Sequence, residues 1–64
     1  MHIVRNYKDA SGNIASIRRL ASLPGVELII TNRDNLIVKS GVYTAEENAK
    51  RAMRRVMTKP IQEV

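Results

Sequence analysis

The side chains in this sequence that are best suited to chemistry are basic ones, which bind phosphate and carboxylate groups. Lys and Arg number 11 against 6 Asp and Glu, for a net charge of +5. Most of the basic residues are Arg, which contacts phosphate or carboxylate in a bidentate manner better than Lys does. This charge favours polyanions or acidic protein surfaces as partners. The predicted nucleic-acid-binding set comprises Arg18, Arg19, Lys50, Arg51, Arg54 and Arg55.

Residues that commonly carry out catalysis are scarce in the chain. His2 is the only histidine, and no cysteine is present to act as a nucleophile. Asp9 and Asp34 lie in polar segments, where Asp is favoured in turns and caps for backbone reasons. We therefore expect no catalytic residue and a protein that is not an enzyme.

The sequence likewise indicates no metal site, no cofactor and no small-molecule substrate. Its carboxylates are few, dispersed and mostly assigned to helix caps and ion pairs. The segment Ser11-Gly12-Asn13 precedes a predicted helix, but it has one glycine and is not followed by a P-loop lysine. A weak anion site at that helix N-terminus stays open.

A predicted β-hairpin organises the elements that must position these side chains. Two runs rich in β-branched residues, at 26–31 and 36–40, flank the turn-forming segment 32–35. Alternation along the strands places one aliphatic set in the core, made of Val26, Leu28, Ile30, Leu36 and Val38. The other face of the hairpin would carry Ile29, Ile37 and Lys39.

One helix is predicted before this hairpin in the sequence and a second helix after it. The first follows the polar loop 8–13 and is predicted because Ile14, Ile17, Leu20 and Ala21 recur at helical spacing. The second spans 45–58, with Thr44 as N-cap and Glu47 completing a capping box. The six basic residues named above would lie on these helices.

Strands at 2–7 and 61–64 complete the order β-α-β-β-α-β. This is the order of the ferredoxin-like plait, an α+β fold in which two helices cover one face of a four-stranded antiparallel sheet. We predict that residues 1–64 form one such domain, and the other sheet face would then be uncovered.

The segment from Leu20 to Val26, with its Leu-Pro-Gly-Val sequence, resembles the helix end and following strand of several small ferredoxin-like families. These are amino-acid-sensing regulatory domains, heavy-metal-associated domains and the signal-peptide-binding chaperone of periplasmic nitrate reductase. The metal-binding Cys-x-x-Cys is absent, and no glycine-rich effector loop follows the first strand. No functional residue of these families is therefore transferred to this chain.

Nucleic-acid binding by base stacking is disfavoured. RRM domains stack bases on aromatic side chains of the first and third strands. Here the predicted third strand has no aromatic residue, and Tyr7 is the only candidate on the first. The mode that remains is phosphate binding by the Arg-rich helices. The alternative is a solvated helical face whose arginines pair with Glu46 and Glu47.

Association with another protein is the second hypothesis. The predicted protein interface on the open face and the adjoining turn comprises Val4, Ile29, Arg33, Ile37 and Lys39. A chain of 64 residues without cysteine buries a small core, so a homodimer is expected. The partner could instead be a different protein, bound along the open face or the strand 26–31, with the chain serving as an adaptor or compact inhibitor of the phage or mobile-element type.

The N-terminal residues lack an apolar run long enough for a signal peptide or a membrane span. We therefore expect a cytoplasmic protein with no membrane partner. Of the hypotheses, we favour a small regulatory or accessory protein that binds nucleic acid as a homodimer.

Overall fold

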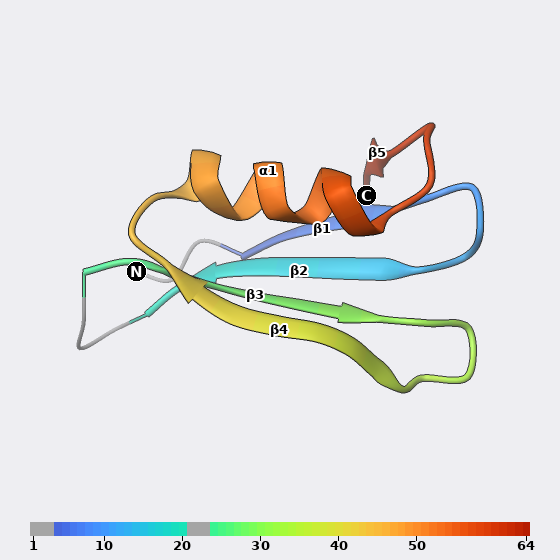
Figure 1. The fold of residues 1–64 in the computed structure, drawn as a ribbon, viewed down its shortest axis with the longest axis horizontal. Coiled ribbons are helices and arrows are strands. Elements are labelled where there is room, and N and C mark those ends of the chain that lie inside the picture. The colour runs from blue at the N-terminus through green and yellow to red at the C-terminus, as the bar shows by residue number, and fades with distance from the viewer. Residues whose placement is uncertain (1–3, 21–23) are drawn as a thin grey trace.

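A computed structural model describes residues 4–20 and 24–64 of the chain. Five strands of these residues form one antiparallel sheet in the order β4-β3-β2-β1-β5, and a helix, α1, lies along one face of it (Figure 1). The elements are β1 (Val4–Lys8), β2 (Ile14–Arg19), β3 (Val26–Thr31), β4 (Ile37–Tyr43), α1 (Glu46–Val56) and β5 (Gln62–Glu63).

The predicted ferredoxin-like plait is wrong, because the first predicted helix is a strand. Segment 14–19 is β2, which runs antiparallel to β1 and pairs Ala15 with Tyr7. Ala15 and Ile17 are buried, which is the two-residue period of a strand and not the helical spacing inferred from the isoleucines. Ala21, the last residue of the predicted stripe, lies outside the described residues, as do residues 2 and 3 of the predicted first strand.

The turn before β2 explains this outcome. The Asp9 carboxylate accepts hydrogen bonds from the backbone N–H groups of Ser11 and Asn13, at 2.9 and 2.8 Å. Gly12 adopts a φ of +88°, which suits glycine. Asp9 therefore stabilises a tight turn between two strands instead of capping a helix. The backbone groups of β2 then form hydrogen bonds with β1 on one side and β3 on the other.

The two strands of the predicted hairpin are present as β3 and β4, but the side chains at the start of β4 face differently from the prediction. The turn is held by Asn32, whose side-chain oxygen accepts from the N–H groups of Asp34 and Leu36. A β-bulge lets Ile30 pair with Lys39 while Thr31 pairs with Ile37. The extra residue turns Lys39 toward the helix-covered face and leaves Leu36 and Val38 exposed, so neither belongs to the core.

The second predicted helix is present as α1, shortened at both ends. Its N-cap is Ala45 without a side-chain hydrogen bond, so the predicted Thr44 cap is wrong. The Thr44 hydroxyl instead accepts from the Asn48 side chain at 3.1 Å. The helix contacts β2, β3 and β4, and the core is the set Tyr7, Ala15, Ile17, Val26, Leu28, Ile30, Ala49, Met53 and Met57.

After α1 the chain returns across the β1–β2 turn and joins the edge of β1. The backbone N–H of Thr58 donates to the Asp9 carboxylate at 2.8 Å, so this side chain ties the helix end to the turn. The chain then pairs β5 with β1, matching Glu63 with Tyr7. A segment that is remote in sequence is thereby placed beside Tyr7 and α1.

Candidate functional site

The basic residues after residue 45 share one element and its C-terminal extension. Residues 46–59 contain two Glu against five basic side chains, a net +3 of the chain's +5. Arg51, Arg54 and Arg55 are exposed on α1, and Lys50 is half-buried. The predicted helical part of the nucleic-acid-binding set is therefore brought together, and Lys59 extends it.

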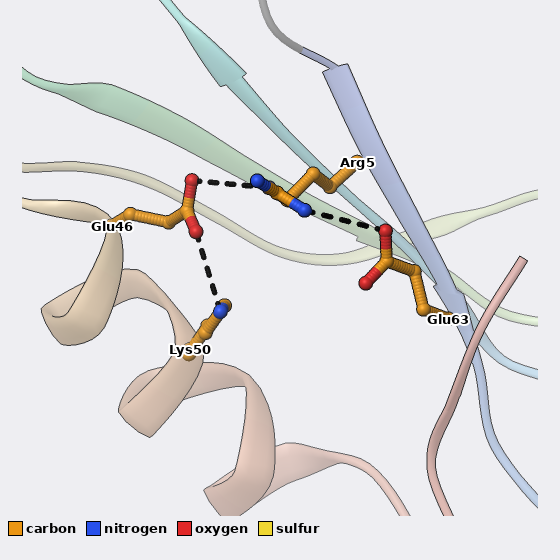
Figure 2. A network of polar contacts seen from close by, with 4 residues as sticks. All are labelled: Arg5, Glu46, Lys50 and Glu63. Atoms are coloured by element: carbon orange, nitrogen blue, oxygen red, sulfur yellow. Dashed lines mark hydrogen bonds and ion pairs between the residues drawn. The ribbon is translucent and has the colours of Figure 1, made fainter.

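Lys50 belongs to a polar network that connects α1 to two strands (Figure 2). Glu46 lies 3.4 Å from Arg5 Nε and 3.3 Å from Lys50 Nζ, and Arg5 Nη1 lies 3.4 Å from Glu63. The hydrogen bond to Glu46, followed by the nearby Tyr7 phenol, raises the pKa of Lys50. Lys50 therefore stays charged at neutral pH, with part of its charge compensated.

The three helix arginines lack such compensation. In the part of the chain that the structure describes, no carboxylate forms an ion pair with Arg51, Arg54 or Arg55. Pairing of these arginines with Glu46 and Glu47, which was the alternative to phosphate binding, is not observed in these residues, and Glu46 pairs with Lys50 instead. This region can attract an anion without first breaking a salt bridge.

Arg18 and Arg19 do not join this region. Both lie on β2, and not on a helix as predicted. Arg18 pairs across the sheet with Glu27, and its Nη2 lies 2.7 Å from the Glu27 carboxylate. This pairing places Arg18 and Glu27 on the face opposite α1, whereas Arg19 pairs with the core residue Val26 and is on the α1 side of the sheet. The predicted six-residue set is thus divided between the two sides of the sheet.

A groove lies between α1 and the C-terminal segment. It consists of two hollows of about 550 and 170 Å³ that share Arg54 and Ile61. We call it the α1–β5 groove, and its lining residues are Tyr7, Lys50, Met53, Arg54, Lys59, Pro60, Ile61 and Glu63. Sequence reasoning missed this groove because its two walls meet only through the long-range pairing of β5 with β1.

The predicted protein interface is only partly assembled. Strand pairing places Val4, Ile29 and Ile37 on the face that no element covers among residues 4–20 and 24–64. Lys39 is on the other face because of the bulge. Arg33 lies in the β3–β4 turn, where its side chain packs over Gly12.

The apolar part of the uncovered face is concentrated on the β4 side. Ile37 is 63% exposed and Val42 is 61% exposed, and both project from β4 on this face. Ile14 and Val4 extend the exposed apolar surface on β2 and β1. We call the set Val4, Ile14, Ile29, Ile37 and Val42 the uncovered apolar face.

Asp9 and Asp34 do not form a catalytic pair. Asp9 is buried and accepts four hydrogen bonds from Ser11, Asn13 and Thr58. Burial alone would raise the pKa of Asp9, but these hydrogen bonds outweigh it and lower the pKa below its ordinary value. Asp34 is exposed in a turn, and His2 lies outside the described residues.

The described residues form neither a metal-binding cluster nor a membrane-spanning helix. No cluster of three or more His, Asp or Glu side chains suited to a metal ion occurs among them. No helix in residues 4–20 and 24–64 has the length and apolarity needed to cross a bilayer. The weak anion site expected at 11–13 is wrong in its premise, because those residues connect two strands and no helix begins there.

Comparison with protein-family models, with curated proteins and with solved structures gave no match to this chain. Its function must therefore be inferred from the surfaces described above. These are the basic side of α1 with its groove, and the uncovered apolar face.

Proposed function

We propose that this chain is a non-enzymatic, cytoplasmic regulatory or accessory protein that binds nucleic acid through the basic side of α1 and acts as a homodimer. One observation carries the proposal: three exposed arginines lie on one short helix, and no carboxylate of residues 4–20 and 24–64 pairs with them. A surface of this kind gains binding free energy from phosphate contacts and from the counterions those contacts release.

The spacing of the arginines also supports an anionic partner. Arg51 is three residues from Arg54 and four from Arg55, so these like charges are neighbours on the helix surface and repel one another. A polyanion would relieve this repulsion. A purely structural explanation also exists, since Arg54 and Arg55 are in the last turn and interact favourably with the helix dipole. A binding measurement separates the two explanations.

The test is the salt dependence of binding to single-stranded DNA, duplex DNA and RNA, measured by fluorescence anisotropy. Wild-type affinity should fall steeply with salt. The double variant Arg51→Ala with Arg55→Ala should reduce the salt slope by about one unit for each lost phosphate contact. Both residues are exposed, so the fold should be retained.

The matched control is Lys8→Gln with Arg33→Gln, which removes the same charge from residues that are not on α1. Both residues are exposed, Lys8 on the face away from α1 and Arg33 in the β3–β4 turn. The control should retain most of the wild-type affinity. Absence of binding at low salt would refute the proposal, as would equal losses in the two double variants.

The homodimer is proposed to form through the uncovered apolar face. This face carries Arg18 and Glu27 side by side, so it lacks the large single-sign charge of α1 and does not oppose self-association. A stable interface needs about 800 Å² from each partner, which is roughly a sixth of the 4570 Å² surface of the chain. A dimer would leave α1 of each copy exposed for the nucleic acid.

The second candidate function is protein binding as an adaptor or compact inhibitor. The same exposed side chains, Ile37 and Val42, favour it. Under this alternative, a different protein covers the face that we assign to the second copy. The two candidates are separated by whether the purified chain self-associates.

A further inference from the structure

One buried polar atom in the α1–β5 groove has no role in the fold. Tyr7 is 7% exposed, and its hydroxyl oxygen is buried without a hydrogen-bond partner among the described residues. An unpaired buried hydroxyl normally costs about 1–3 kcal/mol. The Tyr7 ring packs in the core, but phenylalanine would pack there equally well, so the hydroxyl has no packing function.

Tyr7, which carries this hydroxyl, lines a hollow that is rich in cations. The smaller part of the groove is lined by Tyr7 together with Lys50 and Arg54, and Lys59 lines the adjoining part. The apolar remainder is Met53, Pro60 and Ile61. A hollow of about 170 Å³ is large enough for a phosphate group with some of its water.

The acidic groups near the groove do not cancel this charge. Glu63 is the carboxylate among the lining residues, and it is held 3.4 Å from Arg5 Nη1. Glu46 contacts Lys50 from outside the lining, at 3.3 Å. Arg54 has no carboxylate within ion-pair distance in the described part of the chain. The lining itself therefore has an excess of positive charge.

We propose that the Tyr7 hydroxyl, Lys50 and Arg54 form a binding site for one phosphate group in the α1–β5 groove. Tyr7 donates its unpaired O–H, Arg54 supplies two N–H donors from its planar guanidinium, and Lys50 supplies a third charge-assisted contact. If the proposed function holds, on which this assignment of the ligand rests, the occupant is a backbone phosphate of the nucleic acid. The apolar wall at Pro60 and Ile61 would then lie beside the adjoining sugar or base.

The experiment is a titration of ¹⁵N-labelled protein with inorganic phosphate, and separately with a short oligothymidylate, followed by amide chemical shifts. Sodium chloride at matched ionic strength is the reference. Phosphate should shift the amides of Tyr7, Lys50, Arg54 and Ile61. Tyr7→Phe should weaken phosphate binding by about tenfold, because a hydrogen bond to a charged ligand is lost. The same variant should be at least as stable as wild type, because its unpaired hydroxyl is gone.

Arg54→Ala and Arg55→Ala form a matched pair. They remove the same charge from neighbouring residues of α1, but only Arg54 lines the groove. Arg54→Ala should weaken phosphate binding and Arg55→Ala should leave it nearly unchanged. Equal phosphate affinity in wild type and Tyr7→Phe would overturn the site and would indicate that water satisfies the hydroxyl. Equal losses in the two arginine variants would overturn it as well.

The two ligands separate failure of this site from failure of the proposed function. Oligothymidylate binding without shifts in the groove would refute the phosphate site and leave the α1 surface as the binding region. Phosphate binding in the groove without binding of oligothymidylate, duplex DNA or RNA would refute nucleic-acid binding and support the site for free phosphate or another phosphate-bearing ligand.

Discussion

The two sides of the sheet differ in how their charged residues are arranged. On the α1 side, three arginines face solvent without carboxylate partners in the described residues. On the uncovered side, Arg18 is paired with Glu27 at 2.7 Å and exposed apolar residues surround the pair. The first arrangement suits a polyanion, and the second suits a protein surface that is itself nearly neutral. One small sheet can therefore separate ligand binding from self-association.

The largest expected effect is on stability, and it comes from substitution of Asp9 in the β1–β2 turn. Asp9 accepts four hydrogen bonds and joins the β1–β2 turn to Thr58 at the end of α1. Asp9→Ala leaves several part-buried N–H donors without this partner, so we expect a loss of about 2–4 kcal/mol in the free energy of unfolding. Urea denaturation of the two proteins measures it. A loss below about 0.5 kcal/mol would show that water replaces the carboxylate.

The same residue predicts a pH dependence. The pKa of folded Asp9 is below its ordinary value, so its stabilising contribution is present above the unfolded pKa of about 3.9 and is lost as the pH falls through the folded pKa. The stability difference between wild type and Asp9→Ala should therefore shrink as the pH falls below about 4. A difference that stays constant to pH 2 would contradict the assigned role.

The next largest expected effect is the loss of self-association when charges are placed on the uncovered apolar face. We expect wild type to sediment as a dimer at micromolar concentrations and Ile37→Asp with Val42→Asp to sediment as a folded monomer, because each change buries an unpaired charge in the interface. Both residues are exposed in the single chain, so circular dichroism should be unchanged. Lys8→Gln is the control on the same face and should remain dimeric.

A wild-type monomer would refute the homodimer. The uncovered apolar face would then favour the alternative protein partner, and the same double Asp variant would be the tool for testing it. A dimer that persists in the double Asp variant would instead place the interface elsewhere on the molecule.

Local signals in the sequence predicted some elements correctly. The hairpin was predictable because Asn32 and its neighbours are turn formers between β-branched runs, and α1 because a helix-start signal lies at 44–47, one residue before the observed N-cap Ala45. The segment 14–19 was not, because Ile14 and Ile17 are spaced as on one face of a helix, whereas the Asp9 turn and pairing with β1 and β3 make the segment a strand. The orientation of Lys39 depends on a bulge, which the alternation of residue types does not reveal.

The candidate site was predictable only in its helical half. Lys50, Arg51, Arg54 and Arg55 lie together because a single helix carries them, which periodicity can show. The groove depends on Tyr7 meeting Ile61 and Arg54, and that meeting requires β5 to pair with β1 across the length of the chain. The assignment of Arg18 to the same surface was wrong because it depended on the first helix.

The smallest expected effect concerns the acidic residue at the edge of the groove. Glu63→Gln removes the one carboxylate that lines the α1–β5 groove in the described residues, and it also removes the exposed ion pair with Arg5. Exposed ion pairs contribute little, so the free energy of unfolding should change by less than about 0.5 kcal/mol. The additional positive charge should raise oligonucleotide affinity by about two- to threefold at low salt, and by less at high salt, where charges are screened. Glu27→Gln raises the net charge equally on the other face and should leave affinity nearly unchanged. If both variants raised affinity alike, binding would depend on the charge of the whole molecule, and the distinction between its two sides would not hold.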